Sequence, residues 1–107
     1  MPDEARSETV VVISGALEGP EVDRWGVVMT EAVALQPRRL IIDLGDTPTV
    51  DAAAIAILLQ AHRAMVQAGG RLVLRRPVDR VRRMLRVARV EEVFEVEGAE
   101  TTERNRS

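Results

Sequence analysis

Residues 40 to 59 read Leu-Ile-Ile-Asp-Leu-Gly-Asp-Thr-Pro-Thr-Val-Asp-Ala-Ala-Ala-Ile-Ala-Ile-Leu-Leu. The stretch begins with a nearly continuous apolar run, which is typical of a strand buried on both faces in a mainly parallel sheet. An acidic turn follows, and an alanine-rich segment with high helix propensity comes directly after it. Asp51 stands where its carboxylate can cap that helix by accepting backbone N–H groups. The turn between this strand and this helix is therefore the first place to look for function.

Strand and helix patterns alternate on both sides of this stretch. We expect strands at residues 9–13, 40–44, 72–74 and 93–96, and helices at 21–35, at 52–68 and from Pro77 onward. Gly69-Gly70 is expected to close the second helix as a C-cap. The alternation predicts an α/β fold, with a single sheet of about four to five mixed strands and helices packed on it.

Two apolar tracks run along the expected second helix, one with Ile55, Leu59, His62 and Val66 and the other with Ile57, Ala61, Ala64 and Ala68. In the third helix the spacing predicts four inward residues, Val81, Met84, Leu85 and Ala88. His62, the only histidine, lies within an amphipathic helix, so we interpret it as a core or boundary residue.

The 107 residues fit one small domain with a single core. Residues 1–8 and the acidic and polar residues 98–107 contain few large apolar side chains, so both ends are expected to be flexible. The packed domain is expected to span residues 9–97.

The composition excludes several kinds of chemistry. There is no cysteine, and all fifteen basic residues are arginine. Disulfides, thiolate metal sites, Schiff-base lysines and the phosphate-binding lysine of a P-loop are therefore ruled out. We expect no enzymatic activity and no cofactor. No signal peptide and no apolar run near the roughly 20 residues of a membrane span is visible, so a cytoplasmic protein is expected.

The quoted stretch and the residues after it resemble the signature of the STAS domain, the fold of bacterial anti-sigma factor antagonists. Members usually have a strand ending in Asp-Leu, about six residues, Asp-Ser-Ser-Gly-Leu, a helix, a Gly-Gly turn and another strand. This chain has Asp43-Leu44, Asp51, Ile55 and Gly69-Gly70 in that order. The resemblance covers roughly residues 9–97.

The chain departs from the family pattern at three positions. Ala52 replaces the serine that a partner kinase phosphorylates, Ala54 replaces the motif glycine, and Arg89 replaces a glycine common after the last helix. Without a hydroxyl at position 52, phosphorylation of the usual residue cannot switch this protein.

The resemblance implies that the protein is an anti-sigma factor antagonist, which binds an anti-sigma factor of kinase-like ATPase fold and releases a sigma factor for transcription. The implied partner-binding residues are Thr49, Asp51, Ala52, Ala53, Ala54 and Ile57. The alternative is a scaffold or accessory subunit of a stress-signalling or transporter assembly. We expect no direct contact with nucleic acid and no metal, and leave a homodimer open.

The acidic turn has other interpretations. Asp43, Asp46 and Asp51 could converge on Mg²⁺, although cap and turn roles explain these carboxylates more simply. Thr47 and Thr49 are the only hydroxyls in the turn, so either could be a displaced phosphorylation site, and this also stays open.

An arginine-rich segment leads into the expected third helix and continues through it. Its members are Arg75, Arg76, Arg80, Arg82, Arg83, Arg86 and Arg89, and Asp79 is the single acidic residue among them. This basic face could bind nucleic acid or an acidic protein, or it could be a solvated face paired with the glutamates that follow.

Overall fold

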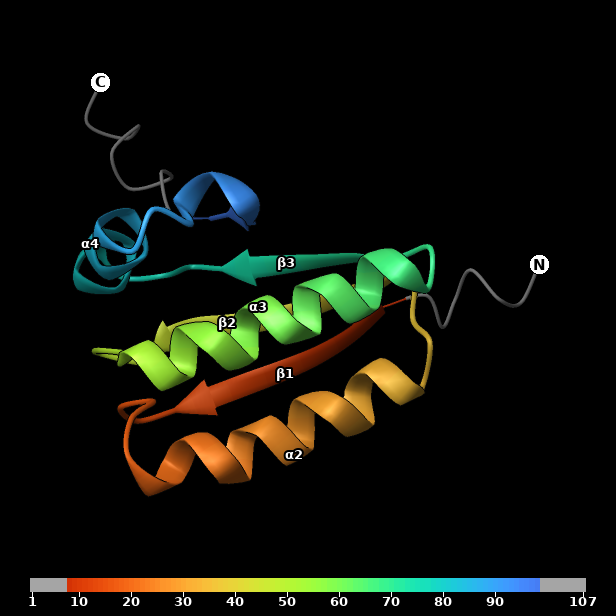
Figure 1. Ribbon diagram of the computed structural model, residues 1–107, viewed down its shortest axis with the longest axis horizontal. Coiled ribbons are helices and arrows are strands. Elements are labelled where there is room, and N and C mark those ends of the chain that lie inside the picture. Colours follow the sequence, from red (N-terminus) through yellow and green to blue (C-terminus); the bar gives the residue numbers. More distant parts are fainter. Residues whose placement is uncertain (1–7, 99–107) are drawn as a thin grey trace.

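The computed structural model of the protein describes residues 8–98. Strands and helices alternate along the chain, as the sequence predicts (Figure 1). They are β1 (Glu8–Ser14), α2 (Pro20–Ala34), β2 (Arg39–Asp46), α3 (Ala52–Gln67), β3 (Arg71–Arg75), α4 (Asp79–Val87), the 3₁₀ turn η1 (Glu91–Val93) and β4 (Glu95–Glu97). The expected α/β fold is confirmed, and most predicted boundaries hold within two residues. The two expected flexible ends lie almost entirely outside the described residues.

The described strands form one sheet in the order β1-β2-β3-β4, and each pair of neighbours is parallel. The expectation of mixed strand directions is therefore wrong for this part of the chain. Every connection between these strands is a helical crossover to the next one, and right-handed crossovers in one direction place their helices on the same face. In Figure 1, α2 and α3 lie side by side, α2 beside β1 and α3 beside β3.

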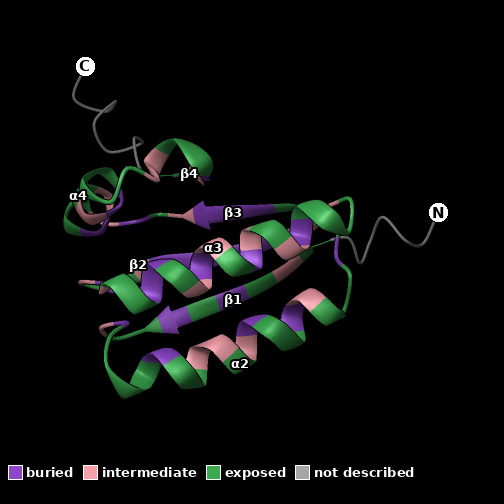
Figure 2. Ribbon diagram, viewed as in Figure 1, coloured by how far each residue is buried: buried purple, intermediate pink, exposed green. Residues whose placement is uncertain are grey.

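One hydrophobic core lies between the sheet and these helices. Figure 2 shows the buried residues along the strands and on the helix sides turned toward them. The core also includes Leu17 and Val50, which lie in loops outside the strands, so it extends to the turn between β2 and α3. The side chains completely enclosed in this core include Ile13, Leu17, Leu40, Ile42, Leu44, Leu58, Met65 and Leu74.

The buried side of helix α3 includes one member of each expected track, Ile55 and Ala61, but not the rest of either track. Its buried residues are Ala54, Ile55, Leu58, Ala61 and Met65, whereas Val66 is 56% exposed. Most of this helix is apolar, so spacing alone could not identify which side packs on the sheet. In α4, Val81 and Leu85 are buried as expected and Met84 is half-buried, but Ala88, directly after the helix, is exposed.

The last strand begins later than the sequence predicts. Val93 belongs to η1 and is 44% exposed, and the strand starts at Glu95. Phe94 between them is buried, so the chain turns there to place its ring in the core. Burial of the aromatic ring therefore outweighs the β propensity of Val93.

Ion pairs connect β4 to β3 and to β2 on the sheet face opposite the core cluster. Glu97 accepts a hydrogen bond of 2.8 Å from Nε of Arg75 and one of 3.2 Å from Nη2 of Arg39. The hydrogen bond from Arg75 is the main cause of the lowered pKa of Glu97.

We expect Glu97→Gln to destabilise the protein by no more than about 1 kcal/mol at pH 7, because the pair is partly exposed to solvent. A lowered carboxylate pKa stabilises the fold above the pKa of an unfolded glutamate, about 4.3, and this contribution is lost as the pH falls through the folded pKa. Urea denaturation at neutral and acidic pH measures the difference in the free energy of unfolding between the variant and the unaltered protein. A difference from the unaltered protein that persists at pH 2 would contradict this explanation.

Each described α-helix is followed by a residue with a left-handed backbone: Gln36, Gly69 and Arg89. After α3, the N–H of Gly70 donates to the carbonyl of Met65 and the N–H of Gly69 to that of Val66. This is a Schellman motif, so the predicted C-cap is confirmed. The same two bonds follow α4, from Val90 to Leu85 and from Arg89 to Arg86.

We expect Arg89→Gly to stabilise the protein by about 1 kcal/mol, because the φ of 64° at Arg89 is unfavourable for any residue with a Cβ. Arg83→Gly makes the same chemical change inside α4 and should destabilise by about 1 kcal/mol. Urea denaturation of both variants measures the free energy of unfolding. A change of the same sign in both would contradict the role of the backbone conformation at position 89.

Candidate functional site at the start of helix α3

Two loops are joined where β2 leads into α3. The N–H of Leu17 donates to the carbonyl of Thr49 at 3.0 Å, and the N–H of Asp51 donates to the carbonyl of Leu17 at 3.2 Å. The Leu17 side chain is completely buried below them. These two hydrogen bonds therefore connect the loop after β1 to the loop between β2 and α3, which carries the predicted site.

Asp51 caps α3, as the sequence predicts. Its Oδ1 accepts the N–H of Ala54 at 2.9 Å, and its Oδ2 accepts the N–H of Gly19 at 3.0 Å. These bonds, the one from Gly19 foremost, lower the pKa of Asp51 because they favour the charged carboxylate. One side chain thus fixes both the helix start and the neighbouring loop.

The first turn of α3 presents small apolar side chains to solvent. Ala52, Ala53 and Ala56 are exposed. Ala54 belongs to the same turn, but it is completely buried in the hydrophobic core. Its expected role in contacting a partner is therefore wrong. Exposed alanines offer a flat surface without charge or long flexible side chains.

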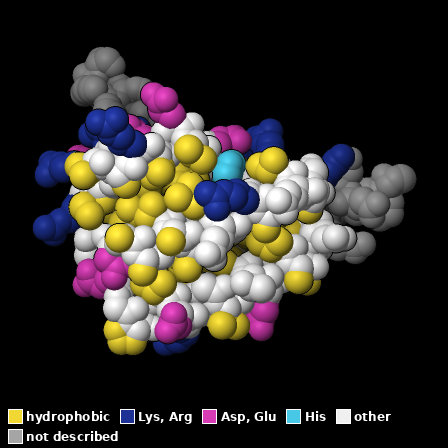
Figure 3. All heavy atoms as spheres, in the orientation of Figure 1, with side chains coloured by type: hydrophobic (Ala, Val, Ile, Leu, Met, Phe, Trp, Pro, Cys, Tyr) yellow, Lys and Arg dark blue, Asp and Glu magenta, His cyan; other side chains and the backbone are white. Residues whose placement is uncertain are grey.

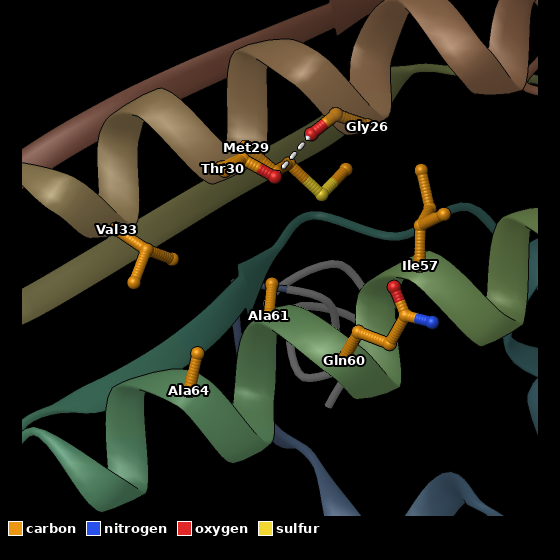
Figure 4. A pocket seen from close by; sticks show the side chains of 8 residues that line it. All are labelled: Gly26, Met29, Thr30, Val33, Ile57, Gln60, Ala61 and Ala64. Carbon is orange, nitrogen blue, oxygen red and sulfur yellow. Dashed lines mark hydrogen bonds between the residues drawn. The ribbon is translucent and has the colours of Figure 1, made fainter.

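Ile57 lies beside this turn, half-buried, at a groove between α2 and α3 (Figure 4). The groove has a volume of about 230 Å³. Its lining residues are Gly26, Met29, Thr30, Val33, Ile57, Gln60, Ala61 and Ala64. A Cβ on Gly26 would lie 3.7 Å from Cγ2 of Ile57, an ordinary contact, so packing does not require glycine there.

The two threonines of the turn differ in accessibility. Thr47 is completely buried, and its hydroxyl donates to the carbonyl of Ile13 at 2.9 Å. A kinase could not reach this hydroxyl without unfolding the loop. Thr49 is half-buried, so of the two candidate phosphorylation sites only Thr49 stays open.

The other carboxylates of the turn have separate surroundings. Asp43 is buried and accepts hydrogen bonds from the N–H of Gly45 at 2.9 Å and from Nη2 of Arg76 at 3.0 Å. Asp46 is exposed. Within residues 8–98 no group of acidic or histidine side chains is arranged to hold a metal ion.

Sequence reasoning missed the contact between Asp43 and Arg76. A Cβ on Gly45 would lie 2.6 Å from Nη2 of Arg76, so glycine makes room for the guanidinium. A glycine near the end of a buried strand is the one signal that could have indicated a close approach.

His62 occupies the boundary position that the sequence predicts. It is half-buried, and its ring meets the ring of Phe94 edge-on at 5.8 Å between centroids. Its Nδ1 is buried without a hydrogen-bond partner among the described residues. The ring therefore contributes to packing between α3 and the segment before β4.

A family model described as "Mlab, STAS domain" matches residues 1–96. The chain belongs to the STAS domain family. The STAS pattern noted in the sequence therefore reflects membership in this family. No curated protein sequence matches this STAS domain.

Solved structures share the fold. A Thermotoga maritima crystal structure, described as that of a "putative anti-sigma factor antagonist", has a TM-score of 0.76 and 13% identity, and the match covers 94% of this chain and 89% of that one. The anti-sigma factor antagonist SpoIIAA in its unphosphorylated form has a TM-score of 0.69 and 19% identity, with 95% and 92% covered. At these identities the likeness establishes the STAS fold.

None of the helices described for this STAS domain is long and apolar enough to cross a membrane.

Proposed function

We propose that the protein is an anti-sigma factor antagonist, which binds an anti-sigma factor of kinase-like ATPase fold and so releases a sigma factor. The partner contacts the start of α3 through Thr49, Asp51, Ala52, Ala53 and the edge of Ile57. The protein acts by binding, without catalysis. The fold shared with anti-sigma factor antagonists supports the class of function.

The observation that carries the proposal is the exposed apolar first turn of α3. Ala52 and Ala53 are exposed although the neighbouring Ala54 is buried. Asp51 anchors the turn to the loop at Gly19, so the surface is rigid before a partner arrives. A preorganised surface loses little conformational entropy on binding.

Binding is constitutive in this proposal, which requires that the half-buried Thr49 is not phosphorylated. Ala52 has no hydroxyl and the hydroxyl of Thr47 is enclosed, so neither position can acquire the charge of a phosphate in the folded protein. The amount of protein, or a competitor, then controls the complex.

The exposed first turn of α3, which has no hydroxyl at position 52, also favours a second candidate function. A scaffold or accessory subunit of a stress-signalling or transporter assembly also needs a permanent docking surface and no phosphate switch.

Titration of the purified protein into the kinase-like anti-sigma factors of the same organism, each loaded with its sigma factor, distinguishes the two candidates. The antagonist proposal predicts a saturable complex and free sigma factor on size-exclusion chromatography. If none of these factors binds, the antagonist proposal is wrong and the accessory role is favoured.

A further inference from the structure

Helix α4 and the residues on either side of it carry an unusual concentration of positive charge. Residues 75–89 contain seven arginines and one aspartate, in a chain whose net charge is −2. Figure 3 shows basic side chains gathered at the end of the molecule where α4 lies in Figure 1, with hydrophobic side chains beside them.

Ion pairs neutralise only part of this charge. Arg82 and Arg86 both approach Glu91, at 3.4 and 3.5 Å. This confirms in part the expected pairing with the glutamates that follow the helix. Arg80, Arg83 and Arg89 are exposed and have no ion-pair partner among residues 8–98.

An apolar side chain lies among the unpaired arginines. Val87 is 73% exposed, the highest value among the large hydrophobic residues of the described part of the chain. Residues three, four and seven apart share one side of a helix, so Arg80, Arg83 and Val87 face solvent together. We call these three residues the α4 face.

We propose that the α4 face binds an acidic protein segment that also carries an apolar side chain. Arginine pairs with carboxylates through two parallel N–H bonds, and Val87 supplies an apolar contact beside the charges. This surface is made of different residues from the start of α3, and the proposal does not depend on the identity of the partner there.

The aromatic content favours a protein segment over nucleic acid. The chain has only two aromatic residues, and Phe94 is buried while Trp25 packs against the core, so neither is free to stack on bases.

Fluorescence anisotropy of a labelled synthetic peptide, rich in glutamate with interspersed leucines, tests the proposal. We expect saturable binding that weakens as salt is added. Arg83→Glu should lower the affinity about tenfold or more. Arg24→Glu changes the net charge equally on α2, away from α4, and should change the affinity less than about twofold. Circular dichroism checks that both variants fold.

Val87→Ser should weaken binding without altering its salt dependence, because it removes the apolar contact alone. The same peptide with glutamine in place of glutamate should not bind. The proposal is overturned if Arg24→Glu and Arg83→Glu have equal effects, if the peptide does not bind, or if a DNA duplex or anionic phosphatidylglycerol vesicles bind more tightly than the peptide.

Discussion

Ala53→Arg is expected to weaken the complex with the anti-sigma factor at least tenfold, which corresponds to about 1.4 kcal/mol. Ala53 is exposed in the first turn of α3, so the long charged side chain enters the proposed contact without disturbing the core. Arginine also has good helix propensity, and the helix should keep its stability. Isothermal titration calorimetry measures the affinity.

Gln67→Arg provides a matched control, because it adds the same side chain at an exposed position at the other end of α3. Its affinity should equal that of the unaltered protein. Ile57→Arg is a poorer test, since Ile57 is half-buried and its replacement would also disturb packing against α2. Equal binding by Ala53→Arg and the unaltered protein would move the interface away from this turn.

Leu17→Ala should destabilise the protein by about 2 to 5 kcal/mol. Leu17 is completely buried, and its backbone holds Thr49 and Asp51 in place. The substitution leaves a cavity below the loop that carries the proposed site. For a domain of this size the melting temperature should fall by about 10 °C or more. Differential scanning calorimetry checks this.

Leu35→Ala removes the same atoms from a side chain that is 70% exposed after α2. Its effect should stay within about 0.5 kcal/mol. If the two variants lost similar stability, Leu17 would not be the support that the structure indicates.

Local patterns in the sequence predicted the parts of the fold that depend on neighbouring residues. The apolar run of β2, the cap at Asp51 and the Gly69-Gly70 ending of α3 are of this kind, and all three are confirmed. The spacing left open which side of α3 is buried, because apolar residues surround most of this helix and only the sheet determines which side is covered.

Long-range contacts account for what the sequence did not reveal. Gly19 donates to Asp51 across 32 positions in the chain, and Arg76 reaches Asp43 across 33. Nothing in the local pattern of either residue indicates its partner. The burial of Ala54 within an exposed alanine run likewise depends on how the first turn of α3 meets the sheet.

The most direct test of a permanent docking surface at α3 is to measure the affinity for the kinase-like anti-sigma factor before and after incubation with ATP. We predict equal affinity and no phosphate on the protein, because Ala52 has no hydroxyl, the hydroxyl of Thr47 is enclosed and the proposal requires an unmodified Thr49. Ala52→Ser restores that hydroxyl and serves as the comparison. Phosphorylation of the unaltered protein with loss of the complex would contradict constitutive binding.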